Sequence, residues 1–113
     1  MKTIIYHNPR WSKSRESVKI LEKKNKDFKI IEYLKEGISS DQIKTIISLL
    51  GIKPKDIIRK SEQDYKNLTL DLDNDTEVTE AITKYPKILE RPIIINGDKA
   101  TIGRPPEKIL EIL

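Results

Sequence analysis

The stretch TIIYHNPRWSKSRESVKIL, residues Thr3–Leu21, decides the fold of this chain. Its first four residues are β-branched or aromatic and predict a strand, and the residues from Ser12 to about Lys24 predict a helix. Val18 and Leu21 lie three positions apart, on one face of that helix. The turn between strand and helix is where α/β proteins commonly bind anions. Trp11 stands at the tip of this turn.

The segments that follow alternate between strand and helix patterns. The run Phe28–Tyr33 predicts a second strand, parallel to a first strand at residues 2–6, with a helix break at Asn25-Lys26-Asp27. Ser39 with Gln42 three residues later has the pattern of a capping box, and Gly51 predicts the end of that helix. Its apolar stripe comprises Ile43, Ile46, Ile47 and Leu50.

The remainder of the chain predicts further helices and then a hairpin. A short piece spans residues 54–58, a loop 68–75, and a helix starting at Asn74 has one face made of Val78, Ala81, Ile82 and Tyr85. Pro92–Ile95 and Lys99–Ile102, joined at Asn96-Gly97, predict an antiparallel hairpin. Pro105-Pro106 predict a closing helix that packs Ile109, Leu110 and Leu113. The order is βαβ, a helical insertion, then ββα, which predicts a four-stranded mixed sheet in one domain, residues 1–113.

Composition excludes several classes of function. The chain has 113 residues, 36% hydrophobic and 35% charged, without an apolar run long enough for a membrane span or a signal peptide, so we expect a cytoplasmic protein. With no cysteine and one histidine, disulfides, thiol catalysis and a metal site are not expected. The net charge of +4 is spread among eighteen acidic residues, which does not favour nucleic-acid binding.

Four segments, in this order, resemble the glutaredoxin-coupled arsenate reductase (ArsC) family. They are residues 7–15 (HNPRWSKSR), 56–59 (DIIR), 90–93 (ERPI) and 102–107 (IGRPPE). The resemblance covers nearly the whole chain. It implies a thioredoxin-like fold with a helical insertion, and a cis peptide bond before Pro92.

The resemblance also implies roles for particular residues. Trp11 stands where the family has the cysteine that attacks arsenate, with glutathione and glutaredoxin as electron donors and no bound cofactor. His7 matches the histidine that favours the thiolate of that cysteine. The oxyanion-binding arginines of the family match Arg59, Arg91 and Arg104. A guanidinium group suits this role because its planar fork donates two parallel hydrogen bonds to an oxyanion.

Each of these residues also has a purely structural interpretation. The arginines could form ordinary surface ion pairs, and His7 could simply be packed or hydrogen-bonded. At the start of the first helix, Ser12 or Ser14 could cap the backbone amides, and the amides left over would still attract an anion. Ser12, Ser14 and Arg15 are therefore secondary candidates for the oxyanion site.

Trp11 leaves several interpretations open. Neither Ser12 nor Ser14 can replace cysteine, because reduction of arsenate requires a sulfur-type donor of two electrons. The indole could mark a natural loss of catalysis, an engineered change or a recoded codon, since UGA can specify tryptophan or selenocysteine. The alternative function is a non-catalytic binding protein that uses Trp11 as a partner anchor. A regulator like the Spx proteins is another form of it, although the Gly103-Arg104-Pro105-Pro106 tail favours the reductase branch.

Overall fold

The computed structural model describes residues 3–24 and 27–113, and the chain divides into two compact units. The first comprises the residues up to Glu36 together with Arg91–Leu113, and the second comprises Gly37–Glu90. The expected strand residue Lys2 and the expected helix break at Asn25-Lys26 lie outside the described residues. Each unit is described by itself, and the expectation of one domain stays a prediction.

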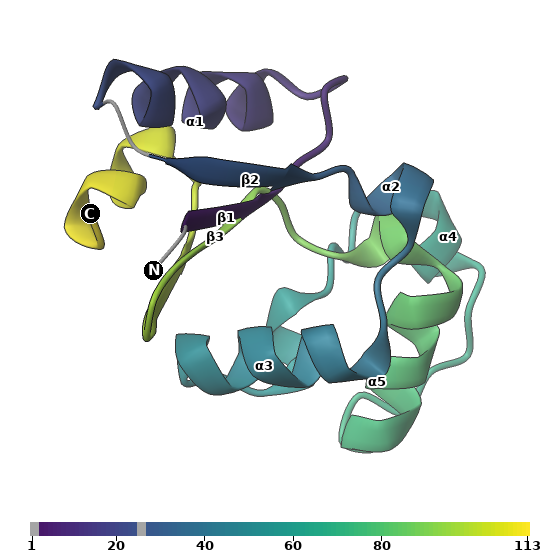
Figure 1. Cartoon of the computed structure of the whole chain (residues 1–113). Coiled ribbons are helices and arrows are strands. Elements are labelled where there is room, and N and C mark those ends of the chain that lie inside the picture. The colour runs from purple at the N-terminus through teal and green to yellow at the C-terminus, as the bar shows by residue number, and fades with distance from the viewer. Residues whose placement is uncertain (1–2, 25–26) are drawn as a thin grey trace. The chain divides into compact units, whose positions relative to one another are not determined.

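The first unit contains a four-stranded mixed sheet with the order β2-β1-β3-β4 (Figure 1). Strand β1 pairs in parallel with β2 and antiparallel with β3, which in turn pairs antiparallel with β4. The predicted parallel pair and the predicted hairpin are both confirmed. The strands are β1 (Thr3–Tyr6), β2 (Phe28–Ile31), β3 (Ile93–Asn96) and β4 (Lys99–Ile102).

Helix α1 (Ser12–Lys23) and the 3₁₀ helix η3 (Pro106–Glu111) pack with the sheet around one core. Its buried members are Ile5, Leu21, Ile94, Ile109 and Ile112, with Val18 partly buried against them. Figure 1 shows the C-terminal segment beside one end of α1. The predicted inner face of α1 is confirmed.

The expectation that Leu110 packs inside was wrong. Residues 106–111 form a 3₁₀ helix, in which side chains three positions apart share a face. Ile109 and Ile112 therefore point into the core, whereas Leu110 is 47% exposed. The spacing of the apolar residues in this segment is compatible with an α-helix and with a 3₁₀ helix. It therefore did not predict which of the two helix types forms.

Strand β2 is shorter than predicted. It ends at Ile31, and the short helix α2 (Tyr33–Glu36) begins two residues later. The Glu32 amide donates to the Glu36 carboxylate at 2.9 Å, and the Glu32 carbonyl accepts from the amides of Lys35 and Glu36. These local bonds take both backbone groups of Glu32, so the strand cannot continue through it.

The second unit is helical, with α3 (Ser40–Leu50) as its most regular element. Ser39 and Gln42 form the predicted capping box, and Gly51 ends the helix in the left-handed region at φ 68°. Ile43 and Ile46 of the predicted stripe are fully buried. The other elements are η1 (Pro54–Ile57), α4 (Gln63–Lys66), α5 (Asp75–Lys84) and η2 (Pro86–Ile88).

Helix α5 begins as predicted, because the Asn74 side chain accepts from the Glu77 amide at 3.1 Å. Val78 and Ile82 are buried on its inner face, whereas Ala81 and Tyr85 are only partly buried. The segment 67–74 has no helix or strand, in agreement with the predicted loop. The single turn α4 was not predicted, because four residues are too few for an apolar period to be visible.

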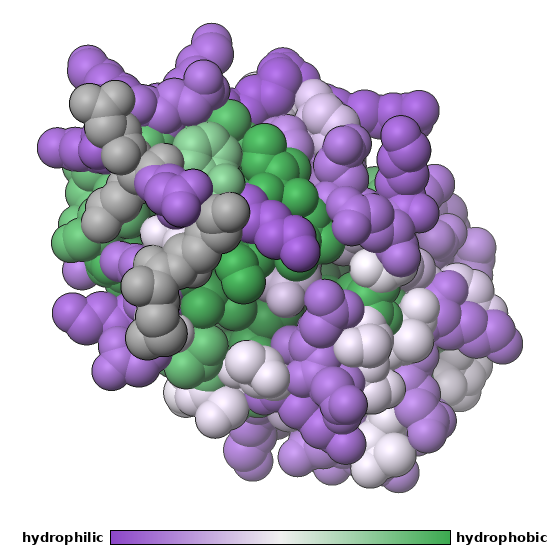
Figure 2. All heavy atoms as spheres, in the orientation of Figure 1, coloured by the Kyte–Doolittle hydropathy of each residue, from purple (hydrophilic) through white to green (hydrophobic). Residues whose placement is uncertain are grey.

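Charged and polar side chains cover much of the face drawn in Figure 2, as expected for a chain with 35% charged residues. Among the helices formed by the described residues, none combines the length and the apolar character that crossing a bilayer requires.

Candidate functional site

Three backbone segments meet at one edge of the sheet in the first unit. In the strand register, Tyr6 at the end of β1 lies opposite Ile93 at the start of β3, and Ile93 lies opposite Ile102 at the end of β4. The loop 7–11, the residues before Ile93 and the residues after Ile102 are therefore neighbours. The Gly103 amide donates to the Pro92 carbonyl at 2.9 Å. This hydrogen bond joins the segment before Ile93 directly to the segment after Ile102.

Hydrogen bonds within the loop 7–11 and from the loop to α1 fix its conformation. The Asn8 side chain accepts from the Arg10 amide at 3.1 Å, and the Asn8 carbonyl accepts from the Trp11 amide at 3.1 Å. The Asn8 amide donates to the Ser14 hydroxyl at 3.0 Å, which fixes the start of the loop to α1. Arg15 donates from Nη1 to the Pro9 carbonyl at 2.9 Å.

Trp11 is the N-cap residue of α1, and its side chain makes no capping hydrogen bond. The Arg15 amide donates to the Trp11 carbonyl at 3.0 Å and is the first amide of the regular helical pattern. The three amides before it, in residues 12–14, have no helical carbonyl to donate to. Since the first turn also contains no acidic residue, the positive end of the helix dipole is not compensated there.

The alternative interpretation, in which Ser12 or Ser14 caps this helix, does not apply, because Trp11 is the N-cap residue and no side chain caps it. Ser14 is fully buried, and its hydroxyl accepts from Asn8 and lies 2.9 Å from His7 Nδ1. Ser12 is the first helical residue, so it follows the capping position. Ser14 therefore supports the loop from inside and does not present its hydroxyl to an anion.

The positive end of α1 opens on a small pocket of about 110 Å³, which we call the Trp11 pocket. It is lined by Trp11, Ser12, Lys13, Arg91 and Arg104. The Arg91 side chain is buried, with its guanidinium carbon 3.5 Å from the centroid of the Trp11 ring, while Trp11 itself is 39% exposed. The pocket thus combines the first residues of α1 with the charges of two arginines and one lysine.

His7 is buried below this loop. Burial is the main cause that lowers its pKa below the usual 6.5; the Glu32 carboxylate opposes that shift and the Arg15 guanidinium adds to it. A lowered pKa disfavours the charged imidazole. Burial therefore opposes a cationic His7 beside residue 11.

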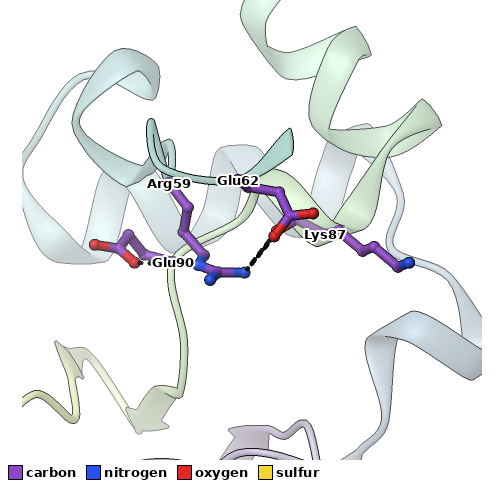
Figure 3. A network of polar contacts seen from close by, with 4 residues as sticks. All are labelled: Arg59, Glu62, Lys87 and Glu90. Carbon is purple, nitrogen blue, oxygen red and sulfur yellow. Dashed lines mark hydrogen bonds and ion pairs between the residues drawn. The ribbon is translucent and has the colours of Figure 1, made fainter. Parts of the chain in front are cut away.

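Arg59 lies in the second unit, within a network of its own (Figure 3). Its Nη1 contacts the Glu62 carboxylate at 3.3 Å and donates to the Lys87 carbonyl at 3.1 Å. Its Nε lies 4.0 Å from the Glu90 carboxylate. Within this unit, Arg59 thus forms ion pairs with carboxylates, as in the alternative to oxyanion binding that the sequence left open for the three arginines.

The structure therefore brings together some of the predicted site residues. Trp11, Ser12, Arg91 and Arg104 line one pocket, whereas Ser14 and Arg15 brace the loop beneath and beside it. The peptide bond Arg91-Pro92 is cis, and so is Arg104-Pro105.

Two residues of the loop and helix start were not singled out from the sequence. Lys13 lines the pocket, and Asn8 organises the turn through its side chain and its backbone. The dipeptide Asn8-Pro9 is a recognised turn signal and could have identified the role of Asn8.

Comparison with known proteins agrees with this geometry. The sequence profile of the ArsC family matches residues 6–112. The chain belongs to the ArsC family. It is 47% identical to an arsenate reductase of Haemophilus influenzae, with all of both chains covered, and 38% identical to an arsenate reductase of Neisseria meningitidis, with 96% of both chains covered. A solved arsenate reductase from Vibrio cholerae superimposes with a TM-score of 0.90 at 36% identity, covering 100% of this chain and 98% of that one.

Membership of the ArsC family confirms the thioredoxin-like α/β fold. Arsenate reduction is the function of the family, whose members use glutaredoxin and glutathione as electron donors. This chain contains no cysteine, which is consistent with the match, implied by the resemblance, between Trp11 and the family's nucleophilic cysteine. Among the described residues, no group of three or more potential metal ligands occurs.

Proposed function

We propose that this chain binds a small tetrahedral oxyanion in the Trp11 pocket and, as written, does not reduce it. The observation that carries the proposal is the convergence of Arg91 and Arg104 on a pocket at the uncapped, positive end of α1. Backbone amides at a helix start and guanidinium groups are both preferred partners of phosphate-like ions. Arsenate, phosphate and sulfate share the shape that this arrangement recognises.

The chain is not expected to reduce arsenate because it lacks the cysteine sulfur on which reduction in the family depends. Reduction in the family begins when a thiolate forms a bond to arsenic, and glutathione and glutaredoxin then return the sulfur to its reduced state. An indole cannot form that bond, and neither serine beside it can supply two electrons. A selenocysteine encoded at residue 11 would restore a competent nucleophile, and mass spectrometry of the native protein distinguishes it from tryptophan.

Anion binding is measured through the fluorescence of Trp11, which is the single tryptophan of the chain. Addition of arsenate, phosphate or sulfate should change its emission with a saturable dependence. Arg104→Ala should weaken binding about tenfold or more, because a hydrogen bond to a charged group typically contributes about 1.5–3 kcal/mol. Arg104 is exposed, so its loss should leave the fold intact.

The matched control is Arg10→Ala, which removes the same charge from an exposed residue next to Trp11 that does not line the pocket. Its affinity should stay within about twofold of the native value, as expected for screened surface charges. Equal weakening by both substitutions would attribute the effect to net charge and contradict a specific site. The same titration with Arg59→Ala tests whether Arg59 belongs to the binding residues, as the family resemblance implies.

A second function is supported by the exposure of Trp11. An indole that is 39% exposed and lies against an arginine has the composition of an interface hot spot. The chain would then be a cytoplasmic binding module whose partner, glutaredoxin among others, uses Trp11 as an anchor. A pull-down with purified glutaredoxin, comparing the native chain with Trp11→Ala, tests this function directly.

A further inference from the structure

The size of the Trp11 pocket limits what it can enclose. Its volume of about 110 Å³ lies well below the roughly 300–1,000 Å³ of clefts that bury a drug-sized ligand. A tetrahedral head group fills such a space. Any substituent on a bound oxyanion must therefore extend beyond the rim of the pocket, and the residues at the rim decide which substituents are favoured.

Trp11 is the apolar residue at that rim. Four large hydrophobic residues are exposed among the described residues, and of these only Trp11 lines the Trp11 pocket. The Arg91 guanidinium, 3.5 Å from the ring centroid, covers one face of the indole. Arg91 is itself 5% exposed, so the ring rests on a buried and therefore well-fixed support. The exposed remainder of the indole is a preorganised apolar surface beside an anion site.

We propose that the preferred ligand of this site is an organic phosphate monoester whose planar ring packs on Trp11. The proposal rests on the oxyanion binding proposed above and adds the class of ligand. The phosphoryl group would accept hydrogen bonds from Arg91, Arg104 and the first amides of α1, while Lys13 adds positive charge at the rim. An aromatic ring stacks on indole without any requirement for a particular hydrogen-bonding pattern.

Isothermal titration calorimetry with phenyl phosphate and methyl phosphate tests this proposal, because the two esters carry the same head group and differ in the ring. The native chain should bind phenyl phosphate about tenfold more tightly, a ratio within the range that stacking on a protein aromatic produces. Trp11→Phe should retain most of the preference. Trp11→Ala should bring the two affinities to within about twofold of each other, with its fold checked by circular dichroism.

Each alternative result has a definite meaning. Equal affinities of the native chain for the two esters would overturn the proposal and leave oxyanion binding in place. A preference that persists in Trp11→Ala would also overturn it, because the ring would then be recognised elsewhere. Failure of both esters and of inorganic phosphate to bind the folded native chain would contradict the proposed oxyanion site as well.

Discussion

At residue 11, where the resemblance to the family implies the nucleophile, the indole of Trp11 is not part of the core. Trp11 is 39% exposed, and its identified packing partner is the Arg91 guanidinium. A cation–π contact at a partly exposed site contributes about 0.5–1 kcal/mol. Trp11→Cys should therefore change the free energy of unfolding by only about 1 kcal/mol, measured by urea denaturation. A loss of several kcal/mol would show that the indole is a core element.

His7 predicts a pH dependence of stability. Its pKa is lowered in the folded chain, chiefly by burial, so below about pH 6.5 the unfolded state binds more protons than the folded state. The free energy of unfolding should then fall as the pH drops from 6.5 toward the folded pKa. His7→Asn removes this contribution and leaves the carboxylates unchanged.

The measurement is a series of urea denaturations of both proteins between about pH 5 and 7.5. The stability of the native chain, taken relative to His7→Asn, should decrease on acidification. If it instead increased, the folded state would favour the charged imidazole, and the assignment of His7 as a buried neutral residue would be wrong.

Gly103 precedes Arg104, and its surroundings leave no room for a side chain. A Cβ atom there would lie 2.8 Å from Ser17 Oγ, 3.0 Å from Pro92 Cγ and 3.2 Å from Ile94 Cδ1. Gly103→Ala should destabilise the chain by about 1–3 kcal/mol, as overpacking of a core does. Thermal or urea denaturation measures the loss. Adding Ser17→Ala removes the shortest contact and should recover part of the stability; no recovery would refute the steric explanation.

At the scale of elements, local signals predicted α3, α5 and the β3–β4 hairpin. The Ser39–Gln42 capping box and the Asn74 cap place hydrogen bonds between residues three apart, so a short window of sequence contains both partners. Two other features depend on tertiary packing and on local hydrogen bonds: the 3₁₀ form of η3 and the residue at which β2 ends. The spacing of apolar residues predicts neither feature.

Arg59 ties two segments of the second unit together. Its guanidinium joins Glu62 to the Lys87 carbonyl, beside the bridge between Ile58 and Leu89. Its side chain is only 11% exposed, so Arg59→Ala leaves these partners without their donor. The free energy of unfolding should fall by about 1.5–3 kcal/mol.

The matched control is Lys60→Ala, a neighbouring exposed cation, which should change stability by less than about 0.5 kcal/mol. Urea denaturation compares the two variants. Equal effects would mean that the Arg59 network contributes nothing beyond an ordinary surface charge.

For the whole molecule, the sequence predicted the architecture and the loop that carries the site. Tyr6, Ile93 and Ile102 are far apart in the chain, yet the sheet register sets them side by side and so brings Trp11, Arg91 and Arg104 to one pocket. The role of Arg91 and Arg104 was predicted from the resemblance to the family. The inward orientation of Ser14, the lowered pKa of His7 and the carboxylates around Arg59 depend on burial and on side-chain contacts, which no sequence pattern encodes.

We propose that this chain keeps an anion pocket and lacks the thiol chemistry of its family. The decisive measurement is arsenite formation from arsenate, with glutathione and glutaredoxin, for the native chain and for Trp11→Cys side by side. The native chain should give no arsenite above background. Trp11→Cys should gain activity, because the start of α1 and the neighbouring arginine charges favour a thiolate at residue 11. Adding Arg91→Ala should remove most of that gain, an effect of about 2.7–4 kcal/mol in transition-state stabilisation. Glutathione-dependent reduction by the cysteine-free native chain would show that the thiol chemistry is not required.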